Sequence, residues 1–249
     1  MSRNAPIEDP EARVRGAVQH YWATRGVQSR RQAERGVTDA GARSAVTGGK
    51  QMDGFVELVR DVLVGSGIPA EEIHHNRKLE LPGYYRAEKQ WDVVVVCDGR
   101  LVAAVEFKSM GSSFANNLNN RVEESVGSAS DLWTAYREGA VPTTPKPWLG
   151  YLMLLVECNR STRPVRVREP HFGVFPEFKG ASYAERCRLL LKRLMREQLY
   201  AATCLITTPE DGGVEGDYAE PDGDLTMLHF LVSLRAQAEG VAAMREGWR

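Results

Sequence analysis

Two apolar runs joined by an Asp-Gly pair constrain the fold of this chain more than any other feature. Residues 91–97 and 100–108 are rich in valine and alanine, and Asp98-Gly99 separates them. Asp-Gly is a preferred turn of a β-hairpin, so the segment predicts two antiparallel strands. Residues 101–105 are apolar without a break, which is typical of a strand buried on both faces. The chain therefore needs a sheet covered on both sides.

Three charged residues are expected at one end of this hairpin. Asp92 begins the first strand, and Glu106 and Lys108 close the second. Residues two apart in a strand share a face, and antiparallel pairing brings all three to one end of the hairpin. Two carboxylates beside an ammonium group can hold a divalent metal next to an activated water. This arrangement predicts a phosphodiesterase site, and the alternative is an ion pair at a solvent-exposed edge, which is worth little.

A second copy of the same triplet serves as an internal control. Glu177-Phe178-Lys179 repeats the residue types of Glu106-Phe107-Lys108. It follows a proline, has no apolar strand before it and has no strand-borne Asp upstream at hairpin distance. With 33 acidic residues in the chain, an acid-x-Lys triplet alone is weak evidence. The prediction therefore depends on the strand context of the first triplet.

Composition limits the class of protein. The chain of 249 residues can bury a sizeable core, and it has neither an apolar N-terminal stretch nor an apolar run long enough to cross a membrane. We therefore expect no signal peptide and no membrane partner. The four cysteines are widely spaced, which predicts free thiols, a reducing and hence cytoplasmic location, and no structural zinc.

The net charge of −1 does not by itself indicate a nucleic-acid partner, but arginines cluster. A proline-containing loop is predicted to offer phosphate contacts through Arg160, Arg163, Arg166 and Arg168. A second basic group lies within residues 186–196, where a solvated helix face and a phosphate contact are equally good readings. Arginine provides a planar fork for phosphates and guanine edges.

Periodicity places further elements around the hairpin. Helices are predicted at residues 11–35, 53–65, 121–138, 181–200 and 225–245, with Asp53 as an N-cap and Gly65 as a stop. Strands are predicted at residues 79–85, 148–158 and 201–207, and loops at 37–50 and 109–120. This order describes an α/β fold with a central sheet flanked by helices.

The hairpin and its surroundings resemble a known family. The order of elements, with Asp92 and Glu106-x-Lys108 on consecutive strands, looks like the core of PD-(D/E)xK nucleases. More specific motifs resemble the XhoI family of type II restriction endonucleases; they lie at residues 52–55, 81–86, 91–92, 101–109, 116–124, 131–139, 170–172 and 178–183. The loop 110–113 is shorter than the family pattern, and Ala87-Glu88 replaces an expected Pro-Thr.

The resemblance implies a single restriction-endonuclease-like domain over residues 1–249, with an N-terminal helical segment at about 10–50 and a nuclease core at about 51–207. The implied fold is a mixed central sheet flanked by helices. The implied protein is a Mg²⁺-dependent homodimer that cuts both strands of palindromic double-stranded DNA, CTCGAG or a related site. It would leave 5′-phosphate ends and defend against foreign DNA beside a separately encoded methyltransferase.

Residue roles follow from the same comparison and from metal chemistry. The resemblance makes Asp92 and Glu106 metal ligands and Lys108 the residue that handles the nucleophilic water. Because Mg²⁺ takes oxygen ligands and keeps several waters, the backbone carbonyl of Phe107 would complete the protein ligands. Asp53 is either a further acid at the site or only a helix cap, and Glu57 is a second candidate acid. His74, His75 and His171 lack a metal-ligand spacing.

A polar segment follows the second strand of the hairpin and is a candidate for reading DNA. It holds Asn116, Asn117, Asn119, Asn120 and Arg121. Asparagine can read adenine and arginine can read guanine, but a turn and a helix cap explain the same residues equally well. Two other functions remain, a structure-specific repair nuclease and a non-catalytic DNA-binding module. The intact Asp92, Glu106 and Lys108 argue against the module.

Overall fold

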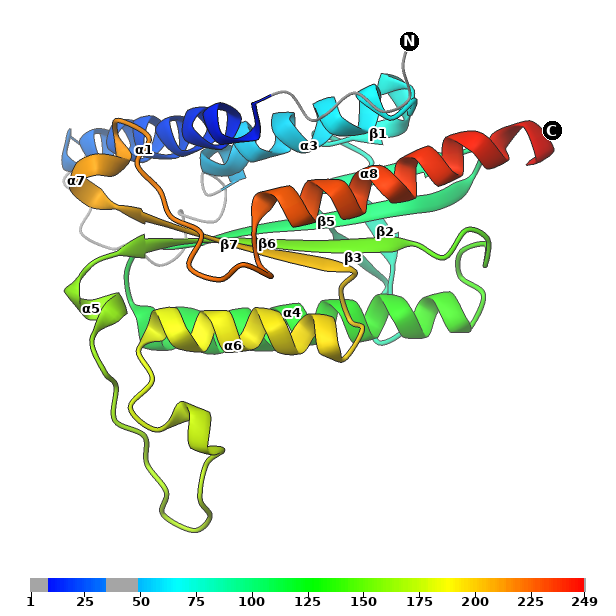
Figure 1. Ribbon diagram of the computed structural model, residues 1–249. Helices are drawn as coiled ribbons and strands as arrows, with labels where there is room; N and C mark the ends of the chain where they lie inside the picture. Colours follow the sequence, from blue (N-terminus) through cyan, green and yellow to red (C-terminus); the bar gives the residue numbers. More distant parts are fainter. Residues whose placement is uncertain (1–8, 35–48, 249) are drawn as a thin grey trace.

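A computed structural model describes residues 9–34 and 49–248 of the chain and shows a mixed sheet between two layers of helices (Figure 1). The five strands are ordered β1-β4-β5-β6-β7. They span Ile73–His74, Val93–Cys97, Arg100–Met110, Trp148–Glu157 and Ala202–Pro209. β1, β4 and β5 pair antiparallel, whereas β5, β6 and β7 pair parallel. The predicted α/β class with a mixed central sheet flanked by helices is confirmed.

Helices cover both faces of the sheet (Figure 1). One face carries α1 (Pro10–Glu34), α3 (Asp53–Gly65) and α8 (Met227–Met244), and the other carries α4 (Phe114–Arg137) and α6 (Tyr183–Arg196). Alternate residues of a strand enter the two apolar cores, as Val93 and Val94 of β4 do. Because both faces are buried, the strands are mostly apolar, and Glu106 is a buried exception on β5.

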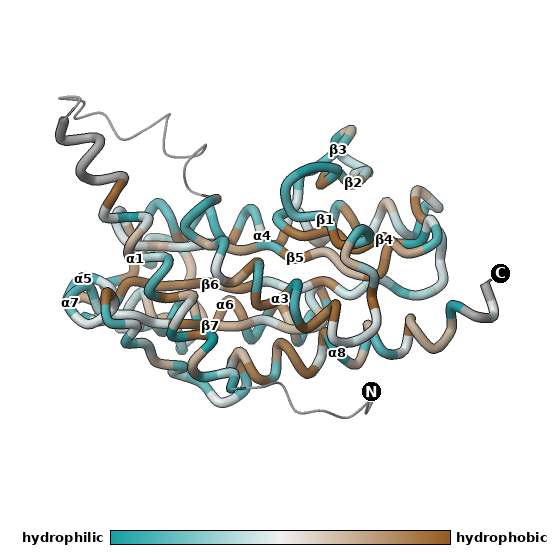
Figure 2. Tube along the Cα trace, turned by 90° about the horizontal axis from the view of Figure 1, so that it is seen from above, coloured by the Kyte–Doolittle hydropathy of each residue, from teal (hydrophilic) through white to brown (hydrophobic). Residues whose placement is uncertain are grey.

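Shorter elements complete the described structure. β2 (Glu80–Pro82) and β3 (Glu88–Gln90) form a separate two-stranded hairpin that stands out from the body in Figure 2. The short helices are α5 (Asn159–Thr162), α7 (Glu210–Gly213), η1 (Gly49–Met52), η2 (Ala70–Glu72), η3 (Pro176–Phe178) and η4 (Arg245–Trp248). No helix among residues 9–34 and 49–248 has the length and apolar character needed to cross a membrane.

The predicted β4–β5 hairpin is present. Asp98 and Gly99 have φ angles of 49° and 73°, the left-handed conformation that a two-residue hairpin turn of this kind requires at both positions. Val93 pairs with Val105, and Asp92 directly precedes β4. The expectation that Lys108 ends the second strand is wrong, because β5 continues to Met110 through its parallel pairing with β6.

The polar loop predicted at residues 109–120 is also wrong. β5 takes residues 109–110 and α4 begins at Phe114, so all four asparagines of this segment lie on the first turns of a helix. Phe114 and Leu118 are buried one turn apart and anchor the helix, while Asn116, Asn119 and Asn120 face solvent. An apolar stripe has overridden the low helix propensity of asparagine.

The bounds predicted for the other elements differ less from the observed ones. The helix predicted at 53–65 is confirmed as α3, and those predicted at 11–35, 181–200 and 225–245 shift by one to four residues. Of the strand predicted at 79–85 only Glu80–Pro82 forms, and most of the loop predicted at 37–50 lies outside the described residues. Cys97, Cys158, Cys187 and Cys204 are free thiols, as expected.

Candidate active site

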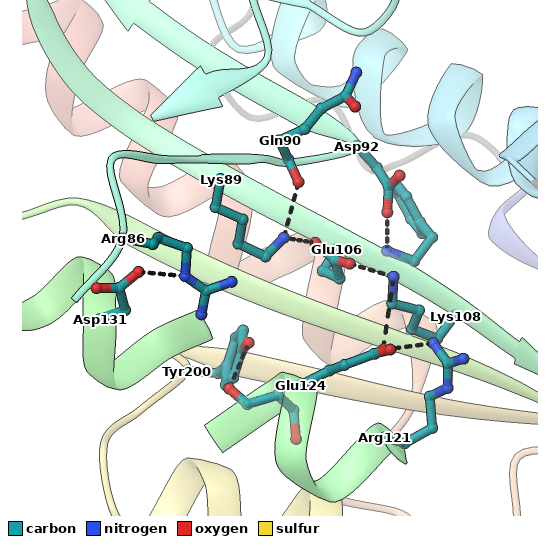
Figure 3. A network of polar contacts seen from close by, with 12 residues as sticks. Arg86, Lys89, Gln90, Asp92, Glu106, Lys108, Arg121, Glu124, Asp131 and Tyr200 are labelled. Atoms are coloured by element: carbon teal, nitrogen blue, oxygen red, sulfur yellow. Dashed lines mark hydrogen bonds and ion pairs between the residues drawn. The ribbon is translucent and has the colours of Figure 1, made fainter. Parts of the chain in front are cut away.

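The end of the β4–β5 hairpin opens into a cleft of about 780 Å³ that Asp92, Glu106 and Lys108 line together. The backbone N–H of Phe107 donates to Asp92 Oδ2 at 2.6 Å, which fixes this carboxylate against β5 (Figure 3). Glu106 is only 6 % exposed, and its Oε1 contacts the Lys108 ammonium. The structure therefore brings together the three residues that the hairpin pattern singled out.

The sequence pattern did not single out a fourth charged residue, Lys89. Its Nζ lies 2.6 Å from Glu106 Oε2 (Figure 3). The same atom lies 4.3 Å from the centroid of the Trp91 ring. β3, which pairs with β2, brings this side chain to Glu106, although Lys89 is not among the residues that line the cleft. Its position three residues before Asp92 is the only sequence signal that marks it. Both oxygens of Glu106 are thus held by ammonium groups.

The N-terminal half of α4 forms the other wall of the cleft. Arg121 and Glu124 both line it, and Arg121 Nη1 donates to Glu124 Oε2 at 2.8 Å. Glu124 Oε2 lies 4.0 Å from Lys108 Nζ, so the pair extends the charge network of the site (Figure 3). Arg121 was predicted as a DNA contact and lies in the cleft, whereas Glu124 was given no role.

The two candidate acids on α3 differ. Asp53 lines the cleft, whereas Glu57 does not and pairs with Arg60 at 3.1 Å. The prediction that Asp53 caps α3 is wrong, because the N-cap is Met52 and no side chain makes a capping hydrogen bond. Burial raises the pKa of Asp53, with charges on His20 and Lys50 opposing the rise. Asp53 is therefore free to act at the cleft.

The remaining predicted residues lie away from the cleft lining. Asn117 donates to the Ser112 carbonyl at 2.5 Å and Asn119 to Glu123 at 2.8 Å, on the outer side of α4. Arg160 lies on α5, with its guanidinium 5.9 Å from the Phe114 ring centroid. Arg163 follows α5 in the chain. The structure does not bring these residues to the three charged groups.

A family model for restriction endonuclease XhoI matches residues 31–220, which contain the whole sheet and the cleft. The chain belongs to the XhoI restriction endonuclease family. It is 51 % identical over 212 residues to the type II restriction enzyme BstVI of Geobacillus stearothermophilus, covering 83 % of this chain and 95 % of that protein. The resemblance drawn from the sequence is confirmed.

Two further relatives are also type II restriction enzymes. XhoI of Xanthomonas vasicola is 45 % identical over 185 residues, which cover 73 % of this chain and 74 % of that protein. AbrI of Azospirillum brasilense is 46 % identical over 168 residues, which cover 67 % and 75 %. No solved structure gives a significant match.

The electrostatics of this XhoI-family site separate its two carboxylates. Burial, followed by the charge of Glu106, raises the pKa of Asp92 to about 6, although the Phe107 N–H and Lys108 act in the opposite direction. Burial also acts to raise the pKa of Glu106, but the ammonium groups of Lys108 and Lys89 outweigh it and hold that pKa below its usual value. At neutral pH both side chains are therefore anionic.

Lys108 keeps its proton in this arrangement. Burial acts to lower the pKa of the ammonium group, but the adjacent Glu106 carboxylate raises it above its usual value. A lysine held in this way is a hydrogen-bond donor and a positive charge, not a base. Its chemical value lies in orienting a nucleophile or compensating negative charge.

The donor set suits a hard cation. Asp92 and Glu106 offer carboxylate oxygens, Phe107 lines the same cleft, and Mg²⁺ binds through one or two carboxylates while keeping several waters. Within residues 9–34 and 49–248, no three His, Cys, Asp or Glu side chains gather in a metal-binding group. A cation here would have to complete its shell with backbone oxygen and water, which fits Mg²⁺ better than zinc.

Proposed function

We propose that this chain is a Mg²⁺-dependent type II restriction endonuclease that hydrolyses both strands of a palindromic duplex, CTCGAG or a closely related site. It leaves 5′-phosphate ends and works as a cytoplasmic homodimer beside a separately encoded methyltransferase, with residues 1–249 as one domain. The observation that carries the proposal is the meeting of Asp92, Glu106 and Lys108 in one cleft of an XhoI-family chain.

Each member of the site has a distinct role in hydrolysis. Asp92, Glu106 and the carbonyl of Phe107 would hold Mg²⁺, which when bound supplies an activated water and neutralises the phosphate oxygens. Lys108, which keeps its proton, donates hydrogen bonds that orient the attacking water and compensate charge at the scissile phosphate. Lys89 contacts the second oxygen of Glu106 and so helps to fix the orientation of the carboxylate.

DNA contacts are assigned to the wall of the cleft and to the basic loop. Arg121 lines the cleft beside Glu124 and is proposed to bind a phosphate. The asparagines Asn116, Asn117, Asn119 and Asn120 follow the active strand on α4 and are proposed to read bases. Arg160 and Arg163 are proposed to contact phosphates further along the duplex, and Asp53 to serve as a further acid beside the metal.

A plasmid digest tests this function. Supercoiled plasmid with a single CTCGAG site is incubated with the protein and Mg²⁺, and the fragment ends are sequenced. One linear product with 5′-phosphates at that site is expected. Discrete cuts at another sequence would assign a different recognition site. Nicking at branched DNA would support a repair nuclease, and uncut but gel-shifted DNA would support a binding module. The last two outcomes contradict the proposal.

A further inference from the structure

The tip of the β2–β3 hairpin presents two tyrosines to solvent. Tyr84 is 54 % exposed and Tyr85 is 75 % exposed, and their rings meet edge to face with centroids 5.0 Å apart. All other tyrosines of the chain are buried or half-buried. Two large rings kept out of the core at one place raise the question of what they contact.

The backbone beneath these rings is fixed by a buried carboxylate. Asp131 of α4 is 3 % exposed, and its Oδ1 accepts the backbone N–H groups of Tyr84 and Tyr85, each at 2.7 Å. Arg86 Nε lies 2.8 Å from the other oxygen (Figure 3). These contacts hold the backbone of the tip in one conformation.

Gly83 shows how closely the tip fits its anchor. A Cβ at this position would lie 2.5 Å from Asp131 Oδ2 and 2.7 Å from the Arg86 carbonyl oxygen. Any side chain there would push the backbone off the carboxylate. The tip is therefore a preformed surface, and rings presented from rigid backbone lose little conformational entropy when they bind.

The other end of the same hairpin touches the active site. Lys89 of β3 contacts Glu106, and Tyr85 precedes it by four residues. At a strand rise of about 3.3 Å per residue, the backbone of Tyr85 lies within about 13 Å of the backbone of Lys89, roughly four base pairs of duplex. Figure 2 shows the hairpin projecting from the body at this edge. A duplex with its scissile phosphate at Glu106 and Lys108 would pass the tip.

We infer that Tyr84 and Tyr85 pack against the DNA next to the scissile phosphate and that Asp131 is the positioning residue that holds them there. The inference rests on the proposed nuclease function and assigns a role to the motifs at residues 81–86 and 131–139, which meet in this contact. Tyrosine suits the task because its ring covers apolar surface of nucleotides while its hydroxyl reaches polar atoms.

DNA-binding measurements test the tyrosines. The full chain carrying Lys108→Ala, which leaves DNA uncut, is titrated onto fluorescein-labelled duplexes with and without CTCGAG, and fluorescence anisotropy is read. Adding Tyr84→Ala and Tyr85→Ala weakens binding of the CTCGAG duplex by roughly tenfold or more. Tyr84→Phe and Tyr85→Phe keep most of the affinity. Phe172→Ala, which removes an exposed ring outside the cleft, leaves it unchanged.

The positioning role of Asp131 has its own readout. Asp131→Ala weakens binding as much as loss of both tyrosines, and the triple variant with both tyrosines replaced shows no further loss, since the acid acts through the rings. Asp131→Asn, which still offers an oxygen to both amides, recovers part of the affinity. Melting temperatures confirm that each variant is folded, and additive losses would contradict the coupling.

The outcomes separate the two proposals. A parent protein that binds neither duplex refutes the nuclease function and the hairpin role with it. A parent that binds tightly while the double tyrosine variant binds equally well refutes only the hairpin role. An equal loss from Phe172→Ala would also refute it, since any exposed ring would then matter.

Discussion

The triplet Glu-Phe-Lys occurs twice in this chain, and only one copy builds a site. Glu106-Phe107-Lys108 lies within β5, and Glu177-Phe178-Lys179 spans η3 and its end. In β5 the acid and the lysine share a face and contact each other. In η3 the backbone turns through one third of a circle per residue, so the same two side chains point to different sides.

Their surroundings differ as much as their backbones. Glu106 is almost wholly buried between two ammonium groups, whereas the Glu177 side chain is 42 % exposed and pairs with Arg193. Lys179 turns away to Glu169 at 3.0 Å. Asp92 lies beside the first triplet, because its carboxylate accepts a hydrogen bond from the Phe107 backbone N–H. The buried strand and Asp92 across the hairpin, not the triplet itself, distinguish the candidate site.

Lysine replacement produces the largest expected contrast. Lys108→Ala reduces cleavage by about 10³-fold or more, because charge compensation at the phosphate is lost. Lys179→Ala cuts as fast as the unchanged protein. Rates are measured on plasmid in Mg²⁺, with a gel shift to show that both variants bind DNA. If Lys108→Ala cuts DNA as fast as the unchanged protein, the assignment of Lys108 to the active site is refuted.

Asp92→Asn separates stability from activity. A native pKa of about 6 against the ordinary 3.8 means that the folded protein binds the proton more tightly, so ionising Asp92 above pH 6 costs the native state about 3 kcal/mol. The uncharged variant is therefore more stable by up to that amount at pH 8 in chelator. The gain shrinks as pH falls through 6 and is gone below 4.

Urea unfolding at a series of pH values measures this gain, and plasmid cleavage shows whether activity is lost. If Asp92→Asn is less stable than the unchanged chain at pH 8, the raised pKa of Asp92 is contradicted. Glu177→Gln is the matched control, since an exposed acid leaves no comparable pH-dependent gain.

Removing one basic partner from the glutamate of each triplet gives a smaller contrast. Lys89→Met leaves Glu106 with a single ammonium partner in a buried setting and lowers the free energy of unfolding by about 1–2 kcal/mol at neutral pH. Arg193→Met removes the partner of the exposed Glu177 and has no measurable effect through that pair. Urea unfolding of both variants in chelator compares them, and equal losses would mean that burial does not matter here.

Much of this contrast was predictable from the sequence. The Asp98-Gly99 turn fixed the hairpin, and the unbroken apolar run 101–105 predicted a strand buried on both faces, as observed. Together they placed Asp92, Glu106 and Lys108 at one end. The absence of a strand before Glu177 correctly marked the second triplet as ordinary surface.

The rest depended on tertiary contacts that local pattern does not carry. Lys89 contacts Glu106 from one of two paired three-residue strands, and those strands are too short to show alternation. The asparagines of α4 have low helix propensity, and the buried Phe114 and Leu118 decide the matter. Asp131 is 45 or more residues from the amides it holds, so nothing local distinguishes it from a surface acid.

Divalent-cation binding tests whether the β5 triplet is the metal site. Mn²⁺, in place of Mg²⁺, is titrated into the unchanged chain, Glu106→Ala and Glu177→Ala, and free Mn²⁺ is followed by electron paramagnetic resonance. We expect Glu106→Ala to lose the tightest Mn²⁺ site and Glu177→Ala to bind Mn²⁺ as the unchanged chain does. Full binding by Glu106→Ala, or its loss in Glu177→Ala, would contradict the claim that the β5 triplet is the metal site.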